Sequence, residues 1–264
     1  MPLKAISTMT TLQAVGYFFS DSWQLLKRNL LHIARDPDQV GGLIIQPVIY
    51  TVIFNYLLGG AINIKSGTYI DYLMPGILVM NIIFASSITF LSIANDLQKG
   101  IFDRLRSLPI SQIALINSHI LASVCRSLVV ITVVVMLGLL IGFRTVATPA
   151  AWLGALGILL LATIAISSLM AIIAASGRSF EAAQQLAFIC IMPLAMISPA
   201  AAPVETMPYL LRVIAQNQPF THVIEAVRAL LFGTAAGSHI MLAVLWCLGI
   251  AVLGFMVSSY RMHK

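Results

Sequence analysis

The sequence predicts an all-α, polytopic membrane protein with six transmembrane helices, an N-terminal amphipathic helix and a re-entrant helical hairpin before the last span. Hydrophobic residues occupy 59% of the 264 positions and charged residues only 9%, which leaves too few polar groups to cover a soluble globule of this size. Several apolar runs reach the roughly 20 residues that a helix needs to cross about 30 Å of hydrocarbon. Because lipid offers no partner to an unpaired backbone group, and no run alternates like a barrel strand, we expect these runs to be helices.

The chain is expected to consist of a cytoplasmic N-terminal segment, residues 1–39, and a single transmembrane domain, residues 40–264. The first segment carries interspersed charges and lacks the continuous apolar stretch of a cleavable signal peptide. The first span is therefore expected to act as the insertion signal.

Six charge-poor runs predict the spans. The third contains one charge, Arg126, and we expect it to begin near Ile113. The fifth is expected to be short, because Pro193, Pro199 and Pro203 punctuate its end. The predicted spans are Val40–Ile64, Tyr72–Asn95, Ile113–Phe143, Trp152–Gly177, Ala182–Val204 and His239–Tyr260.

The positions of lysine and arginine predict the orientation. If both termini are cytoplasmic, ten of the 15 basic residues lie inside, four lie outside and Arg126 lies within a span. The four outside are Lys65, Arg144, Arg212 and Arg228. This imbalance follows the positive-inside rule, so we expect a multi-pass protein of the cell (plasma) membrane with both termini in the cytoplasm. It also accounts for the net charge of +6 without a nucleic-acid partner.

Residues Asp21–Asp36 predict an amphipathic helix at the cytoplasmic membrane surface. Its apolar residues recur at helical spacing and its basic residues lie on other faces. The apolar set is Trp23, Leu26, Leu30 and Ile33, and the basic set is Lys27, Arg28 and Arg35. Two interpretations are open: an anchor to anionic membrane lipid, or a helix that also contacts a cytoplasmic partner.

The cytoplasmic loop Lys99–Ser111 predicts a second, short amphipathic helix, between a glycine and a proline. Its apolar stripe consists of Ile101, Leu105 and Leu108, and Phe102 lies beside this stripe. A connection between two antiparallel membrane helices needs only about two to eight residues, so a helix with its own stripe indicates a surface to dock against. The alternative is a helix that rests on the bilayer.

Three stretches carry a family resemblance. They are the loop run G-I-F-D-R-L-R-S-L-P-I-S from Gly100, the Q-P-V and G-G-A-I pieces that begin at Gln46 and Gly59, and the N-Q-P-F-T-H run from Asn217. In type, order and position they resemble type-2 ABC exporter permeases, most closely the daunorubicin-resistance permease branch. The resemblance extends from about Trp23 to the end of the chain, and it departs from the family's N-P-x-T-H pattern by having Gln218 before the proline.

The resemblance implies six spans, a dimer with a second permease chain (identical or related), and two copies of a cytoplasmic ATP-binding subunit. It implies that the loop helix is a coupling helix received by a groove on that subunit, and that the N-terminal amphipathic helix is the family's interface helix. The implied coupling residues are Gly100, Ile101, Phe102, Asp103, Arg104, Leu105, Arg106, Ser107, Leu108 and Pro109. The implied interface-helix residues are Trp23, Lys27, Arg28 and Arg35.

The outside stretch Glu205–Gly233 is too long and too apolar for a solvated loop. Met207–Gln216 and Pro219–Phe232 each predict a helix too short to cross the hydrocarbon alone, which favours a re-entrant hairpin. Within it, Glu225 and Arg228 are spaced to pair with each other, or they line the translocation path or a gate.

Arg126 has two interpretations as well, because a charge inside a span is costly and usually functional. It either snorkels to the inner interface as an anchor or faces the translocation path. The histidines share no ligand spacing, so neither a metal site nor a catalytic residue is predicted.

The chain contains no G-x-x-x-x-G-K-[ST] loop to hold phosphates, so we expect ATP and Mg to be bound by a separate partner and the chain itself to be a transporter permease rather than an enzyme. The function expected is export of an amphiphilic small molecule, drug or lipid. Alternatives are a polysaccharide-exporting permease of the same superfamily and an ion-coupled secondary transporter. An intramembrane enzyme is disfavoured, since no acidic residue falls inside a predicted span.

Overall fold

The computed structural model describes residues 11–59, 68–101, 112–176, 180–200, 203–204, 207–235 and 237–262, and the regular elements in that part of the chain are helices. They are α2 (Thr11–Arg35), α3 (Pro37–Leu58), α4 (Tyr69–Gln98), α6 (Gln112–Ile141), α7 (Pro149–Ser176), α8 (Phe180–Met196), α9 (Tyr209–Asn217), α10 (Pro219–Phe232) and α11 (His239–Met262). The predicted all-α class is confirmed.

Five helices among the described residues, α3, α4, α6, α7 and α11, are long and apolar enough to cross a membrane. They correspond to five of the six predicted spans. The remaining one, α8, has 17 residues and is therefore only about 26 Å long at 1.5 Å per residue. A multi-pass membrane protein follows from these helices, whereas the count of six spans stays a prediction.

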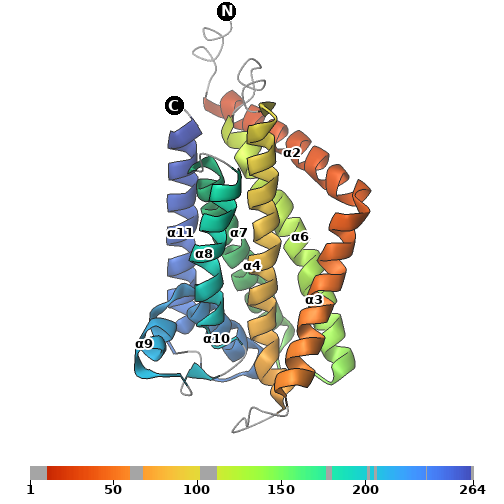
Figure 1. Ribbon diagram of the computed structural model, residues 1–264, viewed down its shortest axis with the longest axis vertical. Helices are drawn as coiled ribbons and strands as arrows, with labels where there is room; N and C mark the ends of the chain where they lie inside the picture. Colours follow the sequence, from red (N-terminus) through yellow and green to blue (C-terminus); the bar gives the residue numbers. More distant parts are fainter. Residues whose placement is uncertain are drawn as a thin grey trace, which may run out of the picture.

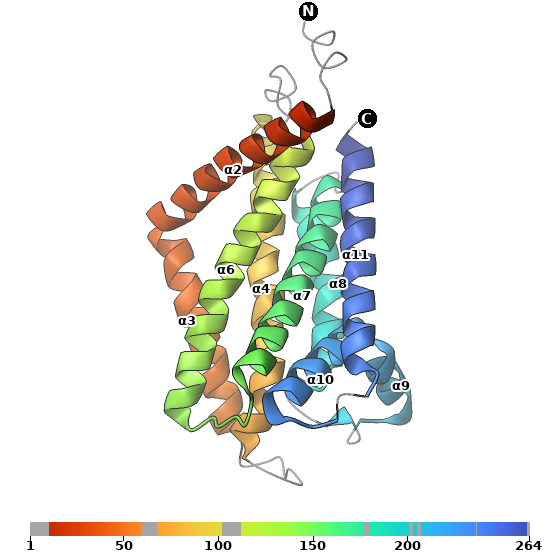
Figure 2. The ribbon, with the colours of Figure 1, turned by 180° about the vertical axis from the view of Figure 1, so that it is seen from behind.

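The long helices stand side by side as a bundle with α7 inside it, packed against α4, α6, α8, α10 and α11 (Figures 1 and 2). Side chains such as Leu73, Ile82 and Met170 are almost completely buried in this core. In contrast, α3 and α11 expose apolar residues, for example Ile45 and Leu253. Large apolar side chains on outer helix faces suit contact with lipid or with another chain.

Helix α2 lies obliquely across one end of the bundle, where it packs on α6 and α3 (Figure 2). The end of α11, the end of α4 and the start of α6 lie at the same end (Figure 1), as the predicted topology requires. Which side of the membrane this end faces stays a prediction. The corner into α3 is capped by Asp36, whose carboxylate accepts hydrogen bonds from the Gln39 backbone nitrogen at 3.3 Å and side-chain Nε2 at 2.7 Å.

Helix α4 is longer than the predicted span and includes Asp71 and Asp96 near its two ends. Asp71 accepts hydrogen bonds from the backbone nitrogen and the hydroxyl of Thr68, which forms a capping box. It also accepts one from the Arg144 backbone nitrogen at 3.0 Å. Both acidic residues lie outside the predicted span Tyr72–Asn95, so the helix extends past that span at each end.

Helix α8 ends at Met196, eight residues before the predicted end of the fifth span. Pro193 lies inside the helix, and its carbonyl accepts a hydrogen bond from Ile197 at 2.8 Å. The residue before a proline is disfavoured in the helical region, so the helix ends before Ser198, which precedes Pro199. The prediction placed the end too late because it extended the apolar run through this turn.

The predicted hairpin consists of α9 and α10, separated by Gln218 in an extended conformation. Most of α10 is buried against α4, α7 and α11, whereas Tyr209 and Leu210 of α9 are each 76% exposed. Both helices lie at the end of the bundle opposite to α2 (Figure 1). The two helices match the expected pattern, and their insertion into the membrane stays a prediction.

Candidate functional site

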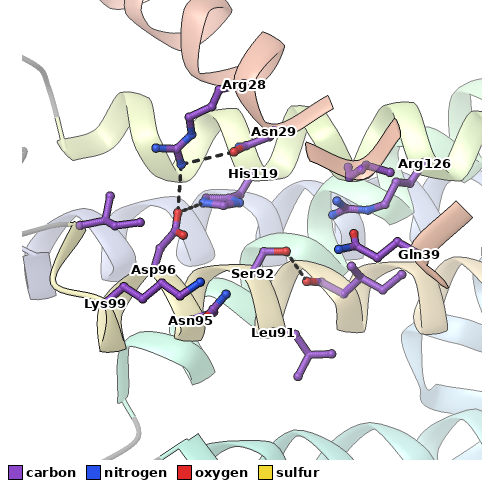
Figure 3. Close-up of a pocket in the computed structure, with 13 residues that line it drawn as sticks. Arg28, Asn29, Gln39, Leu91, Ser92, Asn95, Asp96, Lys99, His119 and Arg126 are labelled. Atoms are coloured by element: carbon purple, nitrogen blue, oxygen red, sulfur yellow. Dashed lines mark hydrogen bonds and ion pairs between the residues drawn. The ribbon is translucent and has the colours of Figure 1, made fainter. Parts of the chain in front are cut away.

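Arg28, Asp96 and His119 meet where α2 crosses α4 and α6 (Figure 3). The Asp96 Oδ2 atom lies 3.1 Å from Arg28 Nη2 and 3.1 Å from His119 Nε2. The imidazole is 4% exposed and the carboxylate 14%, while the Arg28 side chain is 45% exposed. The half-exposed arginine is screened by water, so its ion pair contributes little free energy. The main effect of the cluster is to fix the position of α2 on the bundle.

The inner face of α2 differs from the apolar stripe that its sequence predicts. Asn29 Nδ2 donates to Ser118 Oγ at 3.1 Å, and Asn117 Nδ2 donates to Ser22 Oγ at 3.4 Å. Leu25 and Leu26 are buried between these two contacts. Polar bonds to α6 thus help to select the face that turns inward.

Trp23 lies on the outer side of α2, where its side chain is 67% exposed. Lys27, one turn later on the same face, and Arg35 are exposed as well. Of the four predicted interface-helix residues, only Arg28 is therefore tied to the bundle. The other three are available to lipid or to a partner.

A cavity of about 390 Å³ opens beside the Asp96 cluster, between α2, α3, α4 and α6 (Figure 3). Its charged lining comprises three basic side chains and one acidic one, namely Arg28, Lys99, Arg126 and Asp96. Ile33, Ile88 and Leu91 form an apolar flank. The cavity thus combines a positively charged wall with an apolar wall.

Arg126 lines this cavity and is only 3% exposed. Its Nη2 donates to Thr89 Oγ1 at 2.7 Å, while its Nε has no hydrogen-bond partner. It lies 15 residues before the end of α6 at Ile141, about 23 Å along the helix. In the predicted topology this position falls within a hydrocarbon layer of about 30 Å. The structure thus places the guanidinium in the cavity, and its role as anchor or as part of the path stays a prediction.

The start of the predicted coupling helix follows directly on α4. Gly100 has φ +63°, and its backbone nitrogen donates to Leu97 O at 3.1 Å. A glycine in the left-handed region just after a helix is the usual way to turn the chain out of it. Gly100 and Ile101 thus lie at the end of α4, with Ile101 lining the cavity. The other predicted coupling residues, 102–109, lie outside the described residues.

Arg228 and Glu225 form an ion pair on α10, in agreement with the pairing interpretation. Arg228 Nη2 also donates to the carbonyls of Tyr72 and Pro199 at 3.1 Å each, and its guanidinium carbon lies 4.0 Å from the centre of the Tyr72 ring. These contacts hold α10 against the start of α4. The cavity lies at the other end of α4, so Arg126 and Arg228 do not share a site.

The structure brings together two histidines that the sequence did not relate. His222 of α10 and His239 of α11 approach through their Nδ1 atoms at 3.1 Å. Burial of the imidazole, and then the proximity of His239, lower the pKa of His222 below its ordinary value. Among the described residues no third metal-binding side chain joins them, so this pair joins α10 to α11.

Hydroxyl groups gather in the interior of the bundle. Ser167 Oγ of α7 lies 3.2 Å from Ser86 Oγ of α4 and 2.8 Å from Ser123 Oγ of α6, and all three residues are buried. Small hydroxyl residues let membrane helices approach closely and bond across the contact. Sequence reasoning missed this cluster, and its only signal is the recurrence of serine within three apolar runs.

Residues 21–232 match the family model described as ABC-2 type transporter. This chain belongs to the ABC-2 type transporter family. The matched region contains every predicted site residue, from Trp23 to Arg228.

Individual relatives agree with the family. The chain is 30% identical to the daunorubicin resistance ABC transporter permease protein DrrB1 of Streptomyces coeruleorubidus, over 80% of this chain and 74% of that protein. It is 26% identical to the probable doxorubicin resistance ABC transporter permease protein DrrC of Mycobacterium tuberculosis, over 91% and 87%. It is 27% identical to the putative transport permease ycf38 of Porphyra purpurea, over 86% and 79%.

The predicted resemblance to ABC exporter permeases of the daunorubicin-resistance branch is therefore confirmed. The chain is a multi-pass permease of an ABC-2 type transporter, a class in which ATPase activity lies in a separate subunit. Membership implies, in general terms, an ABC ATPase partner and a permease dimer.

Proposed function

We propose that this chain is the membrane-spanning subunit of an ATP-driven exporter that moves an amphiphilic small molecule, drug or lipid, out of the cytoplasm. Two copies of a separate ATPase subunit bind ATP and Mg, and a second permease chain completes the transporter in the plasma membrane. The observation that carries the proposal is the similarity to permeases named for daunorubicin and doxorubicin resistance over most of the chain. In this proposal α8 is also a span, the fifth of six along the chain, and both termini are cytoplasmic.

The surface of the bundle supports an amphiphile over a polysaccharide. A groove of about 220 Å³ between α4 and α8 is lined mainly by apolar side chains, among them Phe84, Phe90 and Phe188. A sugar polymer is held by hydrogen-bonding groups, and among the described residues this groove is lined by only two polar side chains, Ser87 and Gln184. An apolar, aromatic groove suits a molecule with a flat or aliphatic apolar part.

The proposal is tested in inside-out vesicles that contain the chain together with the ATPase subunit that copurifies with it. We expect ATP-dependent uptake of daunorubicin, which is lost when the phosphate-binding lysine of the ATPase is replaced. Uptake driven by a proton gradient without ATP would contradict the proposal and support a secondary transporter. ATP-dependent uptake of a lipid-linked polysaccharide, with none of the amphiphile, would support the other alternative.

The hairpin and the orientation are tested by cysteine accessibility in a variant without the three native cysteines. Leu210→Cys on α9 and Val146→Cys on the loop after α6 form a matched pair, since both residues are 76% exposed in the isolated chain. If α9 is embedded from the outer side, a membrane-impermeant thiol reagent added outside labels Val146→Cys and leaves Leu210→Cys unlabelled until detergent is added. Equal labelling of both would make the segment a solvated loop, and labelling of Val146→Cys only from the inside would invert the topology.

A further inference from the structure

Arg126 is a buried cation without a counter-ion. Its side chain makes one hydrogen bond, to the neutral hydroxyl of Thr89, and its Nε is unpaired. No ion pair is found for it within the described part of the chain. Removing a charge from water is costly unless a partner compensates it. Arg126 lines the cavity, so an anion inside the cavity is the partner that the geometry allows.

The charges of the cavity wall do not balance. Arg28 and Asp96 pair with each other at 3.1 Å, which leaves Arg126 at the inner part of the cavity and Lys99 at the end of α4 without a described carboxylate partner. Both side chains line the same cavity. Two uncompensated basic groups around one space attract an anion with strong hydrogen-bond acceptors, such as a phosphate.

The apolar wall indicates that the anion carries a hydrocarbon chain. Ile88 and Leu91 lie on α4 and Ile33 lies on α2, along one flank of the cavity. Leu91 is 37% exposed, so this flank reaches the outer surface of the isolated chain. Arg126 itself lies about 23 Å from the outer end of α6 by its place in the sequence. The cavity is therefore near the level of the inner-leaflet headgroups in the proposed topology.

We propose that this cavity binds the phosphate headgroup of an anionic lipid from the inner leaflet. The phosphate lies between Arg126 and Lys99, and the acyl chain runs along Ile88 and Leu91. The site holds α2 to α3, α4 and α6 through a ligand, next to the start of the predicted coupling helix. The assignment to the inner leaflet rests on the proposed orientation of the chain. Binding of the lipid does not depend on which molecule the transporter exports.

The experiment uses the full-length chain in its detergent-purified complex, titrated with dioctanoyl phosphatidylglycerol, dioctanoyl phosphatidylcholine or inorganic phosphate. Binding is followed by native mass spectrometry and by the thermal unfolding midpoint. We expect phosphatidylglycerol to bind and to raise the midpoint, and the other two to do neither at the same concentration. Arg126→Gln is expected to weaken phosphatidylglycerol binding by about tenfold or more, as loss of a charge-assisted hydrogen bond does.

Two further variants distinguish lipid binding at this cavity from a general effect of positive charge on the chain. Lys99→Gln, at an exposed position, is expected to fold normally and to bind several-fold more weakly. Arg35→Gln removes the same charge from the exposed part of α2 outside the cavity and is expected to bind like the parent. Without lipid, Arg126→Gln is expected to unfold at the same temperature as the parent or higher, because it removes an uncompensated buried charge.

Equal binding of phosphatidylcholine, or phosphatidylglycerol binding that Arg126→Gln and Lys99→Gln both leave unchanged, would overturn the proposal. Saturation by inorganic phosphate at the same concentration would assign the site to a soluble anion instead of a lipid. If Arg126→Gln does not fold, Lys99→Gln decides the outcome by the same criteria. Failure of the exporter proposal would show as loss of ATP-driven uptake and would leave this binding result unaffected.

Discussion

Replacing Phe102 with alanine is expected to lower ATP-driven export by about tenfold or more while the chain still inserts and accumulates at the parent level. The sequence places Phe102 beside the apolar stripe of the predicted coupling helix, in the segment that follows α4. A stripe of this kind is expected to fill a groove on the ATPase subunit. An aromatic anchor in such a groove contributes about 2 kcal/mol or more to association, which corresponds to about 30-fold in affinity.

The measurement compares copurification of the ATPase subunit, substrate-stimulated hydrolysis and vesicle uptake in the same membranes. Leu105→Ala on the same stripe is expected to act in the same direction. Asp103→Ala is the matched control, since a rim charge mainly affects association rate and partner choice. If Phe102→Ala and Leu105→Ala leave assembly, hydrolysis and export unchanged, the helix merely rests on the bilayer.

Adding one methyl group at Gly254 of α11 is expected to destabilise the bundle by about 1–3 kcal/mol, as overpacking of a tight contact does. A Cβ atom built there lies 2.4 Å from the Cβ of Ser168 and 3.0 Å from its carbonyl carbon on α7. Neither atom belongs to the far end of a flexible side chain, so the two helices must move apart. Close helix contacts at small residues are a main source of membrane-protein packing.

Gly249 on the same helix provides the matched control, because a Cβ there meets nothing within 4 Å. Gly249→Ala is expected to be neutral or stabilising by up to about 1 kcal/mol, since alanine favours a helix more than glycine does. The thermal unfolding midpoint should therefore fall for Gly254→Ala, and it should rise or stay unchanged for Gly249→Ala. A midpoint for Gly254→Ala at or above the parent's would contradict this account of the α7–α11 contact.

Local patterns in the sequence determine much of the fold. Long apolar runs without charge can only be helices in lipid, and the third predicted span, Ile113–Phe143, agrees with α6 to within two residues at each end. Pro219 starts α10 at the predicted residue, because a proline is tolerated in the first turn of a helix. The family was predictable as well, since the residue runs around Gln46, Gly100 and Asn217 are contiguous and need no contacts to be recognised.

Helix ends at turns were less predictable, as α8 shows by ending at Met196. The run is mainly apolar on both sides of Ser198, and the decisive feature is the backbone restriction before Pro199. The acidic residues Asp71 and Asp96 were placed outside the second span for a related reason. Their carboxylates are compensated by hydrogen-bond and ion-pair partners, and a hydropathy average over a window of residues does not take these partners into account.

The candidate site was decided by tertiary structure. Asp96 meets Arg28 across 68 residues of chain and His119 across 23, and Arg126 meets Thr89 across 37. Sequence singled out Arg126, because a charge inside a span is costly wherever it occurs. It placed Arg28 only among the basic residues of the N-terminal helix. Their partners, the inner face of α2 and the cavity between four helices depend on how those helices cross, and side-chain contacts between distant segments determine that crossing.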